Sequence, residues 1–207
     1  APIYVTAAKN ISNYLLSGIT LSSTKNLIIP IDTYCSSATA TTTPIPGSKG
    51  WKKFIQSRDA ILEFCHTALP QLAYYNTDAG NNFNFVDDDE TTTKLYPFFN
   101  VNATLFGLDG KEILHDRPSV LKLYKNLADL RYSTLGDFTI KTLKANYLGE
   151  SYLTVQWQTT WPISVEGTDR FIFNTNGQVE RIEQIKWIVQ GSPMKDAEWV
   201  RAFVRAV

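Results

Sequence analysis

Cysteine and histidine are scarce in this chain of 207 residues, which contains two of each. Two thiols form at most one disulfide, so a scaffold held together by several disulfides is excluded. A zinc site needs more thiolate and imidazole ligands at suitable spacing than this chain offers. We therefore expect neither a metal site nor a bound cofactor.

Long hydrophobic runs and an excess of one charge are also missing. The best apolar stretch, residues 26–31, is short and contains Pro30, whereas a transmembrane helix needs about 18 or more apolar residues. Twenty basic residues balance twenty acidic ones. The sequence therefore predicts neither a transmembrane segment nor nucleic-acid binding.

Two small motifs depend on the compartment of the protein. Cys35 and Cys65 can form a disulfide, but Cys65 lies in a helical pattern, which favours a small buried hydrophobic residue. The sequons that begin at Asn10 and Asn102 matter only in a secreted protein. The first ten residues lack the pattern of a signal peptide and do not begin with Met, so we expect N-terminal processing.

Composition divides the chain into three parts. Residues 1–50 predict an N-terminal arm and a linker: residues 1–33 fit a short helix or an extended arm, and residues 34–50 are rich in Ser, Thr, Pro and Gly and cannot bury a core. Residues 51–190 predict one α+β domain. Residues 191–207 predict an amphipathic C-terminal helix that docks on the domain or on a partner.

Two helices are expected in the central part. Apolar residues recur at three- and four-residue intervals from Trp51 to Leu69, before Pro70. A second helix begins at Asp116, which is a good N-cap and is followed by Arg117 and Pro118. Between them, residues 87–90 are acidic and read as a solvated loop, since a calcium site needs spaced ligands and a Gly.

The strands are predicted by β-branched and aromatic residues. The segment FFNVNATLF, 98–106, predicts one strand, and a turn with Gly107 and Gly110 follows it. Three longer segments cover 137–148, 151–165 and 168–189, and the last contains the turn Asn174-Thr-Asn-Gly177. Together they predict a curved antiparallel sheet with one apolar face.

This order of elements resembles the cone-shaped α+β fold of the nuclear-transport-factor-2-like and SnoaL-like superfamily. The matching segments are LFGLDGKEILHDRPSVLKLYKNL and GTDRFIFNTNGQVERIEQIKWIV, within a likeness that covers residues 51–190. Within the superfamily the chain is similar to uncharacterised domains of photosynthetic organisms, which implies a plastid or another organelle. The superfamily includes isomerases, dehydratases and cyclases as well as binding and oligomerisation domains, so the fold cannot choose among them.

The resemblance implies a pocket on the inner side of the cone. Alternation in the strand 151–165 places Trp157 and Trp161 on one apolar face, and Trp187 offers further apolar area in the last strand. Strict alternation would put Arg181 and Glu183 on the same face as Trp187. They are either an acid-base pair in the pocket or surface charges on an edge.

Several residues are candidates for catalysis, and each also has a simpler structural explanation. His115 and Asp116 could transfer a proton at the mouth of the cone, but Asp116 is fully explained as a helix cap. Asp169, at the expected start of a strand, is either a base or a turn residue, with Tyr152 or Tyr147 as hydrogen-bond donor. His66 is assigned a structural role because its helical neighbour Cys65 points elsewhere.

Two functions follow from these patterns. The leading prediction is a non-catalytic module that binds an apolar small molecule, a protein partner or a second copy, for example as an accessory subunit of an organellar complex. The alternative is a cofactor-free isomerase, dehydratase or cyclase that acts on a small apolar substrate in the cone. Whether the chain is an enzyme stays open at this point.

Overall fold

The structure is a computed structural model that describes residue 35 and residues 43–69, 72, 95–130, 138–159 and 164–194. Within these ranges, the structure describes only the backbone of residues 125–130, 138, 139 and 159. The predicted N-terminal arm, the acidic run 87–90 and most of the predicted C-terminal helix lie outside the described residues. The central α+β domain lies mostly within them.

Four helical segments are described. Helix α3, Trp51–Glu63, continues without a break into the π-helical turn η1, Phe64–Ala68, so the predicted first helix is confirmed. The short 3₁₀ helix η2, Tyr96–Phe98, leads into the first strand. Helix α6, Arg117–Leu130, is the predicted second helix.

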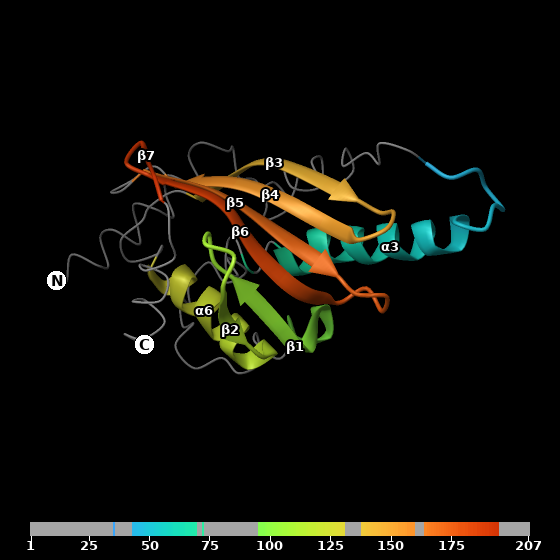
Figure 1. Ribbon diagram of the computed structural model, residues 1–207, viewed down its shortest axis with the longest axis horizontal. Helices are drawn as coiled ribbons and strands as arrows, with labels where there is room; N and C mark the ends of the chain where they lie inside the picture. Colours follow the sequence, from blue (N-terminus) through green and yellow to red (C-terminus); the bar gives the residue numbers. More distant parts are fainter. Residues whose placement is uncertain are drawn as a thin grey trace, which may run out of the picture.

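The strands form one sheet in the order β2-β1-β6-β5-β4-β3, with β7 paired to β6 (Figure 1). Their bounds are Phe99–Phe106 for β1, Glu112–His115 for β2, Phe138–Asn146 for β3, Ser151–Thr159 for β4, Val165–Phe173 for β5, Val179–Val189 for β6 and Ser192–Pro193 for β7. All neighbours are antiparallel except β1 and β6, which pair in parallel. The predicted α+β fold with a curved sheet is confirmed, and the sheet is mixed rather than antiparallel throughout.

The predicted Asn-Gly turn joins β5 to β6. Gly177 has φ 79°, a left-handed conformation that glycine adopts at little cost. The side-chain oxygen of Asn174 accepts hydrogen bonds from the backbone N–H groups of Asn176 and Gln178, at 2.9 and 3.0 Å. Local side-chain chemistry therefore determines where this hairpin turns.

Both long helices pack on one face of the sheet, which we call the inner face. Phe64 of η1 contacts Phe99, Phe171 and Phe173, with ring centroids 6.0, 5.2 and 5.3 Å away. Tyr124 of α6 lies 6.3 Å from Phe171 between ring centroids. The hydrophobic core therefore fills the space between the helices and this face.

Strand β6 does not alternate as the sequence predicts. Its pairing with β5 shifts register between Thr168 and Asp169, so Gly167 pairs with Trp187 but Asp169 pairs with Gln184. A bulge places two residues opposite one and reverses the alternation beyond it. The expectation that Trp187 shares a face with Arg181 and Glu183 is therefore wrong.

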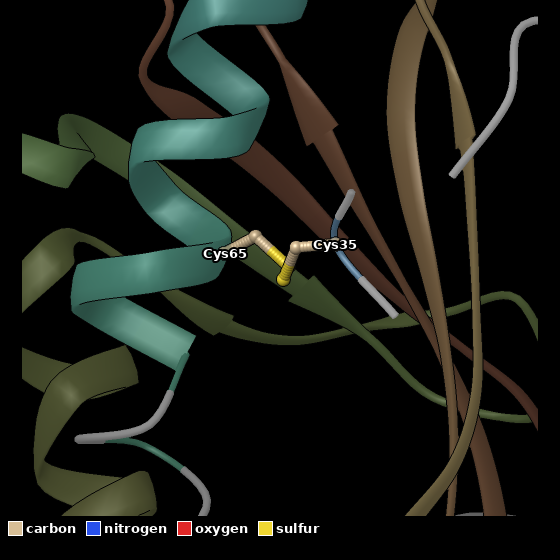
Figure 2. The surroundings of a disulfide bond; sticks show 2 residues. All are labelled: Cys35 and Cys65. Atoms are coloured by element: carbon tan, nitrogen blue, oxygen red, sulfur yellow. A yellow bond between two sulfur atoms is a disulfide. The ribbon is translucent and has the colours of Figure 1, made fainter. Parts of the chain in front are cut away.

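One disulfide joins Cys65 of η1 to Cys35, whose Cα atom lies 6.1 Å away and 30 residues earlier in the chain (Figure 2). Both residues are buried. Burial of Cys65 is confirmed, but the preference for an unbonded residue is wrong. Spacing alone could not show it, because pairing depends on where the segment around Cys35 lies in space.

Candidate functional site

Among the described residues, Asp169 is the one acidic residue that is buried, and it lies on the inner face. It is the fifth residue of β5, between Val155 on β4 and Gln184 on β6, and is only 8% exposed. Its neighbours Gly167 and Phe171, two residues away on either side, face the same way. The sequence suggested the start of a strand, whereas the structure places Asp169 well inside one.

Two tryptophans donate hydrogen bonds to this carboxylate. The indole N–H of Trp157 on β4 lies 2.7 Å from Oδ2, and that of Trp187 on β6 lies 2.9 Å from Oδ1. The two ring centroids are 4.7 Å apart, with the ring planes at 88°. Such edge-to-face packing is a preferred aromatic geometry, so the carboxylate and the two rings hold one another in place.

Gly167 makes this arrangement sterically feasible. It pairs with Trp157 on one side and with Trp187 on the other. A Cβ atom at this position would lie 2.2 Å from both Cε2 and Cζ2 of Trp157. Only glycine therefore lets the Trp157 indole lie directly over the β5 backbone.

Gln184 is the second buried polar side chain beside Asp169, and it is 7% exposed. It is the direct cross-strand partner of Asp169, so the two Cβ atoms are close neighbours on the inner face. Its Oε1 atom is buried and has no hydrogen-bond partner within the described part of the chain. We call these five residues, Trp157, Gly167, Asp169, Gln184 and Trp187, the Asp169 cluster.

Burial raises the pKa of the Asp169 carboxyl from 3.8 to about 6, although the hydrogen bonds from Trp187 and Trp157 act in the opposite direction. Removal from water disfavours the carboxylate, and two neutral donors only partly compensate for the lost hydration. Asp169 therefore changes its protonation state in a pH range close to neutrality. Buried groups of this kind are common at functional sites.

His115 and Asp116 lie away from this cluster, at the junction of β2 and α6. The His115 side chain is 61% exposed, and its Nδ1 atom lies 3.4 Å from Oε1 of Glu112. Oδ1 of Asp116 accepts a hydrogen bond from the Ser119 N–H at 2.8 Å, and this bond lowers the pKa of Asp116. Asp116 therefore caps helix α6.

Tyr152, Arg181 and Glu183 lie on the outer face, because Ile172, the register partner of Tyr152 and Arg181, alternates with the inward Phe171. A guanidinium N–H of Arg181 lies 2.8 Å from Glu150, and another lies 3.1 Å from Glu183. These charges compensate one another at the surface. Tyr147 faces the core, where its ring meets that of Phe54 at 5.8 Å.

Of the predicted site residues, the structure therefore brings Asp169, Trp157 and Trp187 together. Trp161 lies outside the described residues. Sequence reasoning missed Gly167 and Gln184, because the bulge that turns Gln184 inward leaves no sequence signal. A Gly opposite two Trp residues could have suggested a close contact only after the register was known.

Within the described residues, no group of three or more His, Cys, Asp or Glu side chains is arranged to hold a metal ion. None of the helices in this part of the chain combines the length and hydropathy that crossing a bilayer requires. The chemistry available in the described part of the site is therefore one titratable carboxyl, one amide and two indoles.

No protein-family model matches the chain, and no curated protein does either. Similar solved structures include a steroid delta-isomerase from Pseudomonas aeruginosa, 11% identical with a TM-score of 0.47, over 80% of this chain and 94% of that one. A SnoaL-like polyketide cyclase from Shewanella putrefaciens is 9% identical with a TM-score of 0.39, over 73% of this chain and 92% of that one. A bacterial protein with a cystatin-like fold from Silicibacter pomeroyi is 13% identical with a TM-score of 0.42, over 56% of this chain and 74% of that one.

At such identities and TM-scores, these likenesses carry no argument about the function of this chain. The case for a function rests on the Asp169 cluster.

Proposed function

We propose that this chain is a binding domain that takes a small, mainly apolar molecule at the Asp169 cluster. The observation that carries the proposal is the buried carboxylate held between two indole N–H groups on the inner face. A buried carboxylate costs stability, and a hydrophobic residue of similar size would avoid that cost. A polar anchor within an aromatic wall is the usual composition of a small-molecule site.

The two indoles supply the apolar part of this site. Trp187 is buried, whereas Trp157 is only partly buried, so the cluster reaches solvent on the Trp157 side. A ligand that packs against Trp157 would bury further apolar area, and Asp169 would orient it. The rings would therefore supply most of the contact area with the ligand, and the carboxyl would set its orientation.

Indole N–H resonances provide a direct test. We expect p-cresol, used as an aromatic probe, to shift the Trp157 and Trp187 signals of ¹⁵N-labelled protein in a saturable way. Trp51 serves as an internal control, because it stacks on Phe54 in α3 at a centroid distance of 5.6 Å, away from the cluster. Unchanged Trp157 and Trp187 signals, or equal shifts of all three, would count against the proposal.

The second candidate is the cofactor-free isomerase, dehydratase or cyclase. It is favoured by the burial of Asp169, which raises its pKa to about 6, because a general base works best when its pKa lies near the working pH. Asp169 would then remove a proton next to a carbonyl or hydroxyl group. The exchange of cyclohexanone α-hydrogens in D₂O tests this role.

We expect the exchange rate to rise with pH around 6 and to fall to the uncatalysed rate in Asp169→Asn. A wild-type rate no faster than buffer would leave binding as the better assignment.

The predicted protein partner, homo-oligomer and plastid location rested on the N-terminal arm, the C-terminal helix and the resemblance. They stay predictions, and light scattering of the purified chain tests the oligomeric state.

A further inference from the structure

Gln184 has a buried hydrogen-bond acceptor that no donor of the described residues satisfies. Its Oε1 atom is buried beside Asp169 and has no hydrogen-bond partner among the described residues. A buried amide oxygen that loses its hydrogen bonds to water destabilises a protein by about 1–3 kcal/mol. A leucine or methionine would fill similar space on this face without that cost.

The groups around Gln184 Oε1 limit which donor could form a hydrogen bond with it. Both oxygens of Asp169 already accept an indole N–H, and the carboxyl offers a donor of its own only when it is protonated. The two indole N–H groups point to Asp169 rather than to Gln184. A molecule bound in the cluster that carries a hydrogen-bond donor would satisfy Oε1.

We propose that Gln184 Oε1 accepts a hydrogen bond from a hydroxyl group of the ligand, so that the site selects apolar molecules that carry a hydroxyl. This inference rests on the proposed function and names the ligand class of that site. A neutral hydroxyl fits better than an ammonium group, because burying a cation has a large desolvation cost that a hydroxyl does not have. The Trp rings would hold the apolar remainder of the molecule.

The test compares p-cresol with toluene, which differ only in the hydroxyl group. The measured quantity is the ratio of the two dissociation constants, obtained from indole N–H shifts in wild type and in Gln184→Leu. We expect the preference for p-cresol to fall at least about tenfold in Gln184→Leu, the effect of losing roughly one well-placed hydrogen bond. Because the same two solutes are measured with both proteins, the difference in hydration between p-cresol and toluene cancels when the two ratios are compared.

Gln184→Leu also removes the unsatisfied acceptor, so its Tm should equal or exceed that of wild type. Gln156→Leu is the matched control, because Gln156 is exposed on β4, which lies beyond β5 from the β6 strand of Gln184, and accepts its hydrogen bond from Thr142. This variant should keep the wild-type preference for p-cresol. A lost preference in Gln156→Leu would show an unspecific effect and overturn the assignment to Gln184.

The outcomes separate the two proposals. If wild type binds neither probe, the proposed function and this inference both fail. If wild type binds both probes and Gln184→Leu keeps the wild-type ratio, the inference alone fails. Benzylamine is a third probe, and tighter binding of benzylamine than of p-cresol would overturn the choice of a hydroxyl.

Discussion

At the scale of single residues, Asp169 links stability to pH. Its pKa is about 6 in the folded chain and near 3.9 when unfolded, so the folded state holds this proton more tightly. Stability from this group is therefore fully present below about pH 4, is lost as pH rises through about 6, and stays lost above that. The difference across this range is roughly 2–3 kcal/mol.

We predict that the free energy of unfolding of wild type falls between pH 4 and 7.5 by the contribution of Asp169, and that Asp169→Asn does not show this fall. Urea unfolding at each pH is the measurement. Asp169→Asn also has a loss of stability that does not depend on pH, since its NH₂ group meets one of the indole N–H groups. Other carboxyl groups titrate in both proteins, so the relevant curve is the difference between the two. A difference independent of pH would contradict the burial of an ionisable Asp169.

Gly167 leaves the space that the Trp157 ring occupies beside Asp169. We predict that Gly167→Ala lowers stability by roughly 1–3 kcal/mol, because the new methyl group overlaps the Trp157 ring, and that the Trp157 indole N–H signal shifts. In a Trp157→Leu background the same substitution should cost little, which a double-mutant cycle measures. Equal costs in both backgrounds would show that the ring does not need the space over Gly167.

At the scale of elements, the start of α6 depends on Asp116, which has φ 81° and caps the helix. We predict that Asp116→Ala lowers the free energy of unfolding by roughly 1–3 kcal/mol, because the cap is lost and Ala tolerates this backbone poorly. Asp116→Asn should stay close to wild type, since Asn keeps the acceptor and adopts positive φ readily. Thermal unfolding of both variants is the measurement, and equal losses would argue against the cap.

Elements with local signals could be predicted from the sequence, and the others could not. Helices α3 and α6 have periodic apolar residues, and the β5–β6 turn has its Asn-Gly pair, so each was found. Strand β2 is only four residues long, and the sequence pattern does not identify it. The parallel pairing of β1 with β6 and the bulge beside Asp169 depend on contacts between distant segments, which leave no periodic pattern.

In the candidate site, too, some residues could be predicted from the sequence and others could not. Trp157 and Trp187 could be proposed because large aromatic residues in strands usually face a core or a pocket. Asp169 could be named but not ranked, since its burial follows from the register of three strands. Gln184 could not be placed, because strict alternation assigns it to the face opposite Trp187.

At the scale of the whole molecule, the disulfide connects Cys35 to Cys65 in η1, the turn that continues helix α3. Closing a loop of 30 residues restricts the unfolded chain and contributes about 3–4 kcal/mol. We predict that Cys65→Ser, or dithiothreitol added to wild type, lowers the free energy of unfolding by about this amount in urea. Dithiothreitol should not affect Cys65→Ser, and an unchanged wild type would show that the bond does not form.

The parallel pair of β1 and β6 has a consequence for how the protein is made. The hydroxyl of Thr104 donates to the carbonyl of Glu180, 76 residues later, whereas β3, β4, β5 and β6 each pair with the next strand in the chain. During synthesis, β1 and β2 therefore leave the ribosome long before the strand beside which they belong. Closing so long a loop is slow, and until β6 emerges one edge of the nascent β1–β2 hairpin stays open to incorrect pairing, a hazard for which chaperones exist.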